Sequence, residues 1–120
     1  NLIKQNKLLH GAFNLEIVNG TAPGILERLE PPTHVFIGGS SGKLSQIIDI
    51  VFAKNNNARI VINAVTLETV ADVQRIIGDN KSIKADISYI PVSKAKALGN
   101  YNIMQALNPV WIIVIEQEVL

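Results

Sequence analysis

The chain has 120 residues, of which 48% are hydrophobic and 18% are charged, and its net charge at pH 7 is +1. This length suits at most one domain with its own core, and the composition is typical of a folded chain. The near-zero charge argues against nucleic-acid binding, and the longest apolar run, residues 110–115, is far shorter than the ~20 residues that cross a bilayer. We therefore expect neither nucleic acid nor membrane as a partner. The two histidines lack metal-ligand spacing, so no metal site is expected.

The first part of the chain predicts a helix, a strand and a second, short helix. Residues 1–9 are expected to be helical, and Gly11 is expected to close this helix because glycine readily adopts the left-handed cap conformation. Residues 14–18 alternate between polar and apolar, which predicts a strand. Pro23 suits the first turn of a short helix over residues 24–29.

The middle of the chain predicts a β-α-β unit followed by a further helix. Residues 35–37 are a continuous apolar run, which predicts a strand covered on both faces. The helix after it is predicted by apolar residues at helical spacing: Leu44, Ile47, Ile48, Val51 and Phe52. Residues 60–62 predict the next buried strand, and residues 67–77 an amphipathic helix. Because ligands bind outside the carboxyl ends of parallel strands, the polar segments 38–42 and 63–66 are expected to face one cleft.

Two strands end the pattern, at residues 83–92 and 109–115. Residues 93–108 between them are expected to be a polar connection with a helical turn at 103–107. Because no long helix separates the two strands, they are expected to pair antiparallel. The result is an α/β fold with a mostly parallel sheet and an antiparallel last strand. No strand precedes the first helix, so we expect the alternating strand–helix pattern of the sheet to begin part-way through, without its first strand.

Three stretches, in this order and spacing, resemble one enzyme family: Val-Phe-Ile-Gly-Gly-Ser-Ser-Gly at 35–42, Asn-Ala-Val-Thr-Leu-Glu at 63–68 and Ala-Leu-Asn-Pro-Val-Trp at 106–111. The chain resembles the methyltransferases of cobalamin biosynthesis that act on precorrin-6Y, or its cobalt form, at carbons 5 and 15. The match is to the decarboxylating carbon-15 subunit or C-terminal domain. The resemblance implies the Rossmann-like fold of class I S-adenosylmethionine-dependent methyltransferases. Residues 1–120 are then a single partial domain, about the C-terminal two-thirds of it.

The resemblance implies methylation of a precorrin macrocycle at carbon 15, with decarboxylation of the ring-C acetate and S-adenosylmethionine as cofactor. It also implies a homo-oligomer and, as partner, a carbon-5 methyltransferase domain or subunit. A chain without cysteine suits a reducing cytoplasm, where we expect this one to act. The family's glycine-rich cofactor loop and ribose-binding acid have no counterpart in the chain, so this fragment alone is expected to be inactive. The sequence does not decide whether the substrate holds cobalt.

The resemblance places cofactor contacts in two turns. Gly20, Thr21 and Ala22 stand where the family usually has Gly-Asp-Ala-Pro against the adenine edge, so Thr21 offers a hydroxyl in place of a carboxylate. Gly38 and Gly39 are implied to form the floor of the cleft, because residues without side chains let ligands approach the backbone. Ordinary tight turns are the alternative for both segments. The second turn lacks the spacing of a P-loop, which excludes a nucleoside triphosphate site.

The resemblance also implies a set of substrate contacts: Ser40, Asn63, Thr66, Lys94, Lys96, Gly99 and Tyr101. Polar groups at Asn63 and Thr66 suit hydrogen bonds to pyrrole nitrogens or carboxylates, although Thr66 also suits the N-cap of the following helix. Ammonium groups at Lys94 and Lys96 suit the acetate and propionate groups of the substrate, and a solvated loop is the alternative.

No nucleophile–histidine–carboxylate set is visible in the sequence, and the chemistry does not need one. The methyl group of a sulfonium is already electrophilic, so the enzyme contributes mainly orientation. The catalytic residues are left unassigned, His34 is expected to be structural, and Trp111 is expected to belong to the core. Two alternatives stay open: a class I methyltransferase of another substrate, and a non-catalytic remnant that serves oligomer assembly.

Overall fold

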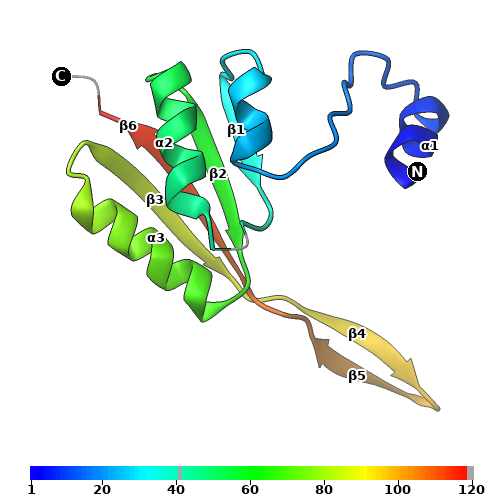
Figure 1. The fold of residues 1–120 in the computed structure, drawn as a ribbon. Coiled ribbons are helices and arrows are strands. Elements are labelled where there is room, and N and C mark those ends of the chain that lie inside the picture. Colours follow the sequence, from blue (N-terminus) through cyan, green and yellow to red (C-terminus); the bar gives the residue numbers. More distant parts are fainter. Residues whose placement is uncertain (41, 119–120) are drawn as a thin grey trace.

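The computed structural model describes residues 1–40 and 42–118, which form a four-stranded sheet with its helices and a separate hairpin (Figure 1). The sheet has the order β1-β2-β6-β3, with β1 (His34–Ile37), β2 (Arg59–Ala64), β6 (Val110–Gln117) and β3 (Ile83–Ile90). The helices are α1 (Leu2–Leu9), the 3-10 helix η1 (Gly24–Arg28), α2 (Leu44–Lys54) and α3 (Leu67–Asp79). The hairpin consists of β4 (Ser93–Leu98) and β5 (Tyr101–Ala106). Among the described helices, none is both long and apolar enough to cross a membrane.

The predicted β-α-β unit is confirmed. The buried side chains of α2 are those whose spacing predicted it: Leu44, Ile47, Ile48, Val51 and Phe52. The helix ends at Asn55, which turns to an extended conformation while its backbone N–H donates to the carbonyl oxygen of Val51 at 2.9 Å. β1 and β2 pair in parallel, with Ile37 opposite Ile62. The segments that follow the two strands therefore leave the sheet at the same edge, as expected.

The predicted amphipathic helix after β2 is also confirmed, and it extends to Asp79 rather than to residue 77. Its N-cap is Thr66, whose Oγ1 accepts a hydrogen bond from the backbone N–H of Thr69 at 3.2 Å. This bond satisfies one of the backbone donors that the first turn of a helix leaves free. On its inner side the helix buries Val73, which is 1% exposed.

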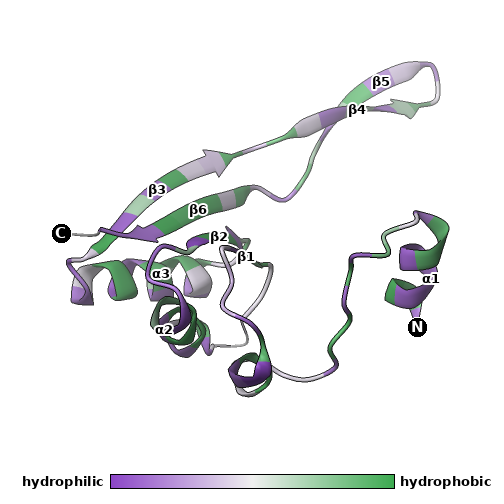
Figure 2. Ribbon diagram, turned by 90° about the horizontal axis from the view of Figure 1, so that it is seen from above, coloured by the Kyte–Doolittle hydropathy of each residue, from purple (hydrophilic) through white to green (hydrophobic). Residues whose placement is uncertain are grey.

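The helices cover only one face of the sheet, which corrects the prediction that residues 35–37 form a strand covered on both faces. Figure 2 shows α2 and α3 on the same side of the four strands. In β2 the buried residues Ile60, Ile62 and Ala64 alternate with less buried ones, and Phe36 on the other face of β1 is 67% exposed. A continuous apolar run does not reveal which faces are covered, because that depends on where the crossover helices pass.

The last strand, β6, lies between β2 and β3 and runs antiparallel to both. The predicted antiparallel pairing of the two terminal strands of the sheet is therefore confirmed, with Ala85 opposite Ile115. Ile115 is also opposite Ile60, and both side chains are 0% exposed, so β6 carries the centre of the core. Trp111 packs against this core half-buried, as expected, with its ring centroid 4.8 Å from that of Tyr89.

Residues 93–108 are not a polar connection with a helical turn, and this prediction was wrong. They form the hairpin β4–β5, which projects from the end of the sheet as a separate two-stranded ribbon (Figure 1). Leu98 pairs with Tyr101 across a two-residue loop, in which Gly99 has a φ of +59°. Glycine adopts this left-handed conformation without strain, and Gly-Asn between two strands is a hairpin signal. The alternating alanines and lysines of β4 concealed that signal because neither residue type favours strands.

The predicted strand at residues 14–18 is absent. Residues 12–15 form a turn, in which the N–H of Leu15 donates to the carbonyl oxygen of Ala12 at 3.1 Å. A strand needs a neighbour for its backbone hydrogen bonds, and no described strand pairs with this segment. The segment leads from α1 to η1 as an extended connection (Figure 1). α1 itself forms as predicted, with Asn1 as its N-cap, and has no buried residue among those described. The short helix after Pro23 is confirmed as η1.

Candidate functional site

A cavity of about 410 Å³ runs along the outer edge of β1, where this strand faces η1 and α2. β1 contributes every residue from His34 to Ile37, and the cavity continues to Gly38 and Gly39 at the carboxyl edge of the sheet. Most of its other lining residues are apolar, among them Leu26 of η1 and Val51 of α2. The volume and the apolar walls are those of a small-molecule site.

Polar contacts from the end of α2 hold in place the segment from Glu27 to Pro32, which forms one side of this cavity. Lys54 Nζ donates to the carbonyl oxygens of Glu27 at 3.1 Å and Leu29 at 2.7 Å. The next residue, Asn55, donates from Nδ2 to the carbonyl oxygen of Pro32 at 2.9 Å. These bonds attach the segment between η1 and β1 to the end of α2. The helix therefore lines the cavity with its own side chains and also holds the segment on the opposite side of the cavity in position.

Three of the five predicted cofactor residues line this cavity: Ala22, Gly38 and Gly39. Gly20 and Thr21 precede it and form part of the turn before η1, which is the alternative role that the sequence left open. A Cβ at Gly20 would lie 2.8 Å from Cγ1 of Ile25, so glycine lets η1 pack closely against this turn. The carbonyl oxygen of Thr21 accepts from the N–H of Ile25 at 3.2 Å and starts the turn of η1. Both contacts join residues four or five positions apart, within the turn that leads into η1.

The glycines after β1 are not required by packing among the described residues. A Cβ at Gly39 would meet no atom within 4 Å, and one at Gly38 would meet only Phe36 at 3.4 Å. Gly42 differs, because its φ of +79° lies in the left-handed region that favours glycine. Within the turn, the N–H of Lys43 donates to the carbonyl oxygen of Ser40 at 2.9 Å. Ser41, the remaining member of the predicted glycine turn, lies outside the described residues.

Asn63, the predicted substrate residue of β2, lies beside this turn. Asn63 follows Ile62, the partner of Ile37, so it is adjacent to Gly38 across the two parallel strands. Its Oδ1 is buried and has no hydrogen-bond partner among the described residues, so an unsatisfied acceptor lies at this edge of the sheet. Thr66 is instead engaged as the cap of α3, with its Oγ1 also 2.9 Å from the Oγ1 of Thr69.

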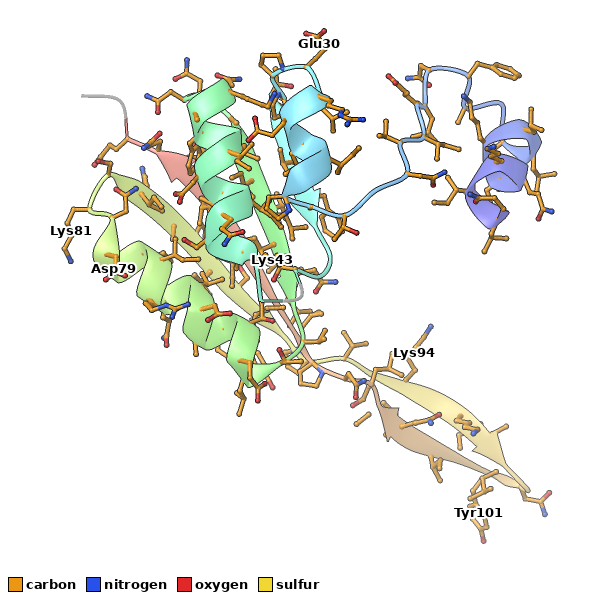
Figure 3. All side chains as sticks on the ribbon, in the orientation of Figure 1. Glu30, Lys43, Asp79, Lys81, Lys94 and Tyr101 are labelled. Atoms are coloured by element: carbon orange, nitrogen blue, oxygen red, sulfur yellow. The ribbon has the colours of Figure 1, made fainter. Side chains whose placement is uncertain are left out.

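The remaining predicted substrate residues, Lys94, Lys96, Gly99 and Tyr101, belong to the hairpin β4–β5. None of the predicted substrate residues, including Ser40, Asn63 and Thr66, lines the cavity. β3 points the same way as β1 and β2, so the hairpin leaves the sheet at the edge that carries the glycine turn. It then extends away from that edge, and Figure 3 shows Tyr101 at its far end, remote from Lys43. The sequence predicted a polar connection for this segment, whereas the structure places the four residues on a projecting two-stranded ribbon.

A family model and several known proteins match this chain. The model of a precorrin methyltransferase domain family matches residues 1–117. The chain is 32% identical over 113 residues to a protein of Pyrobaculum calidifontis, covering 93% of this chain and 57% of that protein. It is 32% identical over 116 residues to a protein of Saccharolobus solfataricus, covering 94% of this chain and 58% of that protein. Both relatives are named "Probable cobalt-precorrin-6B C(15)-methyltransferase (decarboxylating)".

Solved structures of similar proteins have the same fold. A precorrin-6y C5,15-methyltransferase from Geobacter metallireducens superposes with a TM-score of 0.84 at 35% identity, covering 97% of this chain and 60% of that one. A precorrin 8W decarboxylase of Methanobacterium thermoautotrophicum gives 0.83 at 27% identity, covering 97% and 62%. The expected class I methyltransferase fold is confirmed. The chain spans less than two thirds of the length of these relatives. Because the family model matches residues 1–117, nearly the whole chain, the chain belongs to the precorrin methyltransferase domain family.

Proposed function

We propose that the chain is part of an S-adenosylmethionine-dependent enzyme of cobalamin biosynthesis, within which residues 1–120 are a single partial domain. The enzyme methylates a precorrin macrocycle at carbon 15 and removes the ring-C acetate carboxylate as carbon dioxide. The observation that carries this proposal is the shared edge of the sheet, where the glycine turn after β1 adjoins the unpaired Oδ1 of Asn63. The names of the relatives from Pyrobaculum and Saccharolobus support the choice of carbon 15.

The cofactor is proposed to bind at the end of the cavity formed by Ala22, Gly38 and Gly39, with Gly20 and Thr21 shaping the turn before it. The residues present fit the adenine ring of this group, because the walls are apolar and the two glycines leave open backbone beside them. When bound, S-adenosylmethionine supplies an electrophilic methyl group on its sulfonium. The share of this chain is to orient the cofactor and exclude water, a kind of positioning that is worth ~7–11 kcal/mol of barrier in favourable cases.

The macrocycle is proposed to contact the same edge of the sheet. The side-chain amide of Asn63 has an unpaired acceptor and two donors, which suit a pyrrole N–H or a carboxylate once the substrate displaces the atoms that cover Oδ1, and Ser40 lies in the adjacent turn. Thr66 contributes from the next turn while it caps α3. Lys94, Lys96, Gly99 and Tyr101 are proposed to contact the acidic periphery of the substrate from the hairpin, which starts at this edge.

Three further parts of the proposal concern the whole protein. It acts in the cytoplasm, it forms a homo-oligomer, and a carbon-5 methyltransferase domain or subunit acts with it. The exposed hairpin supports an assembly role and therefore also a second candidate function, a domain that serves assembly without catalysis. Binding of the cofactor product separates these two functions, because only the enzyme needs the cavity.

The test is calorimetric titration of S-adenosylhomocysteine into the protein, expressed together with whatever coding sequence precedes Asn1. The decisive variant is Gly39→Leu, which adds a bulky side chain to a residue that lines the cavity. A Cβ at this position meets no atom within 4 Å, so the substitution does not clash at that carbon. The matched control is Gly78→Leu, which also has open space at the Cβ but lies in α3.

We expect the parent protein and Gly78→Leu to bind equally, and Gly39→Leu to lose binding by at least about tenfold with an unchanged melting temperature. Absence of binding by the parent protein would reject the enzyme and favour the assembly domain. If Gly39→Leu binds as well as the control, the cofactor site lies elsewhere. With the precorrin substrate, mass spectrometry then distinguishes carbon-15 methylation with loss of carbon dioxide from methylation of another substrate.

A further inference from the structure

Asn19 lies in the extended connection between α1 and η1, and Gly20 follows it. The residue is exposed and belongs to no helix or strand. Among the described residues, its side-chain amide has no hydrogen-bond partner, and the backbone N–H of Gly20 donates to no acceptor. Glycine also has no side chain that crowds its own nitrogen. The amide carbon of Asn19 and the neighbouring backbone nitrogen can therefore approach each other.

The other asparagines do not combine these features. Three are followed by a backbone N–H that already donates a hydrogen bond, from Leu15, Asn57 or Ala58. Three have an engaged side-chain amide: Asn1, Asn55 and Asn80. Three lie in a helix or strand: Asn6, Asn63 and Asn102. Of the last two, Asn108 precedes a proline, which has no N–H, and Asn100 precedes Tyr101, whose side chain crowds the nitrogen.

We propose that Asn19 deamidates spontaneously through a cyclic imide. The backbone nitrogen of Gly20 loses its proton to hydroxide and attacks the side-chain carbonyl carbon of Asn19. The new N–C bond closes a five-membered ring, and the bond to the side-chain nitrogen breaks, so this nitrogen leaves as ammonia after it takes up a proton from water. Water then adds to one of the two ring carbonyls and opens the ring. Opening one way gives aspartate, and opening the other way gives isoaspartate, in which the main chain runs through the side-chain carbons.

The conversion changes the turn before η1. Both products add a negative charge to a chain whose net charge is +1, and isoaspartate also lengthens the main chain by a carbon atom immediately before Gly20. Gly20 has no room to shift toward η1, because a Cβ there would already lie 2.8 Å from Cγ1 of Ile25. The same turn continues to Ala22, which lines the cavity. The conversion therefore destabilises this part of the fold, and this inference does not depend on methyl transfer.

The test is prolonged incubation of the protein, expressed together with whatever coding sequence precedes Asn1, in warm and mildly alkaline buffer. Ion-exchange chromatography follows the change of charge, and peptide mapping by mass spectrometry locates the converted residue. Asn19→Gln keeps the amide but would have to close a larger ring, so it is the blocked variant. The matched control is Asn100→Gln, which changes the other exposed asparagine of a turn. A synthetic peptide of residues 14–24 gives the rate of conversion without the folded structure.

We expect Asn19 to convert before any other asparagine in both the parent protein and Asn100→Gln, at a rate within about tenfold of that of the peptide. Asn19→Gln is expected to keep its charge over the same time. After incubation, the parent protein is expected to melt at least about 2 °C below Asn19→Gln, although the two melt alike when fresh.

Three results would count against the inference. If Asn19 stays intact while another asparagine converts, the site is wrongly assigned. A rate in the folded protein more than about tenfold below that of the peptide would mean that the segment has to open before it reacts, which also overturns the assignment. Conversion at Asn19 without a lower melting temperature would refute the predicted change of the turn before η1.

Discussion

Replacing Gly20 by alanine tests whether this glycine is needed for packing. The new Cβ would lie 2.8 Å from Cγ1, 2.9 Å from Cβ and 3.0 Å from Cδ1 of Ile25, all well inside normal contact distances. Rotation of the Ile25 side chain cannot relieve the overlap with its own Cβ, so η1 has to move. Overpacking of this kind costs about 1–3 kcal/mol, and we expect Gly20→Ala to lower the free energy of unfolding by that amount.

Urea denaturation followed by circular dichroism measures this loss. The matched control is Gly24→Ala in η1, where a Cβ meets nothing within 4 Å, and we expect it to stay within about 0.5 kcal/mol of the parent. A second check is the double variant with Ile25→Ala, which removes two of the three overlapping carbons. Its loss is expected to be smaller than the sum of the single losses by about 1 kcal/mol. If Gly20→Ala is as stable as Gly24→Ala, the packing role of Gly20 is refuted.

Three further predictions concern the core, a helix cap and the wall of the cavity, and urea denaturation measures the first two. Ile62→Ala is expected to cost about 3–4 kcal/mol because this side chain is 1% exposed, whereas Phe36→Ala on the open face is expected to cost much less; equal losses would contradict the one-sided core. Thr66→Ala is expected to cost about 1 kcal/mol through loss of the cap, and Thr66→Ser to restore most of it; no rescue by serine would contradict a capping role. Lys54→Met keeps the aliphatic stem but removes both donors to the carbonyls of residues 27 and 29, so amide hydrogen exchange at Leu29 is expected to accelerate while α2 stays protected; unchanged exchange would show that other contacts hold this wall.

The local pattern of the sequence predicted the central elements of the fold well. The apolar spacing of α2, the cap at Thr66 and the parallel pairing that brings residues 38 and 63 together are all as expected. Each of these depends on residues close together in the sequence, or on the short connection that a β-α-β unit imposes. The family followed from three such stretches and is confirmed by the comparisons.

The failures concern contacts between distant parts of the chain. The lysines of β4 lie on a projecting ribbon rather than in a polar connection, because the strand β4 pairs with β5 although alanine and lysine do not favour strands. Residues 14–18 have the alternation of a strand but pair with no described strand, so the pattern alone was insufficient. Phe36 has the composition of a core residue and is nevertheless exposed, because the crossover helices lie on the other face.

The sequence by itself determined the helices, most strands, the shared edge of the β-α-β unit and the family, because periodicity, caps and turn residues act over a few positions. Only the tertiary structure decided that β6 lies between β2 and β3, that one face of the sheet is covered, and that the cavity forms where η1 folds against β1 and α2. Those features arise from packing between residues far apart along the chain, and no local pattern encodes which distant surfaces meet.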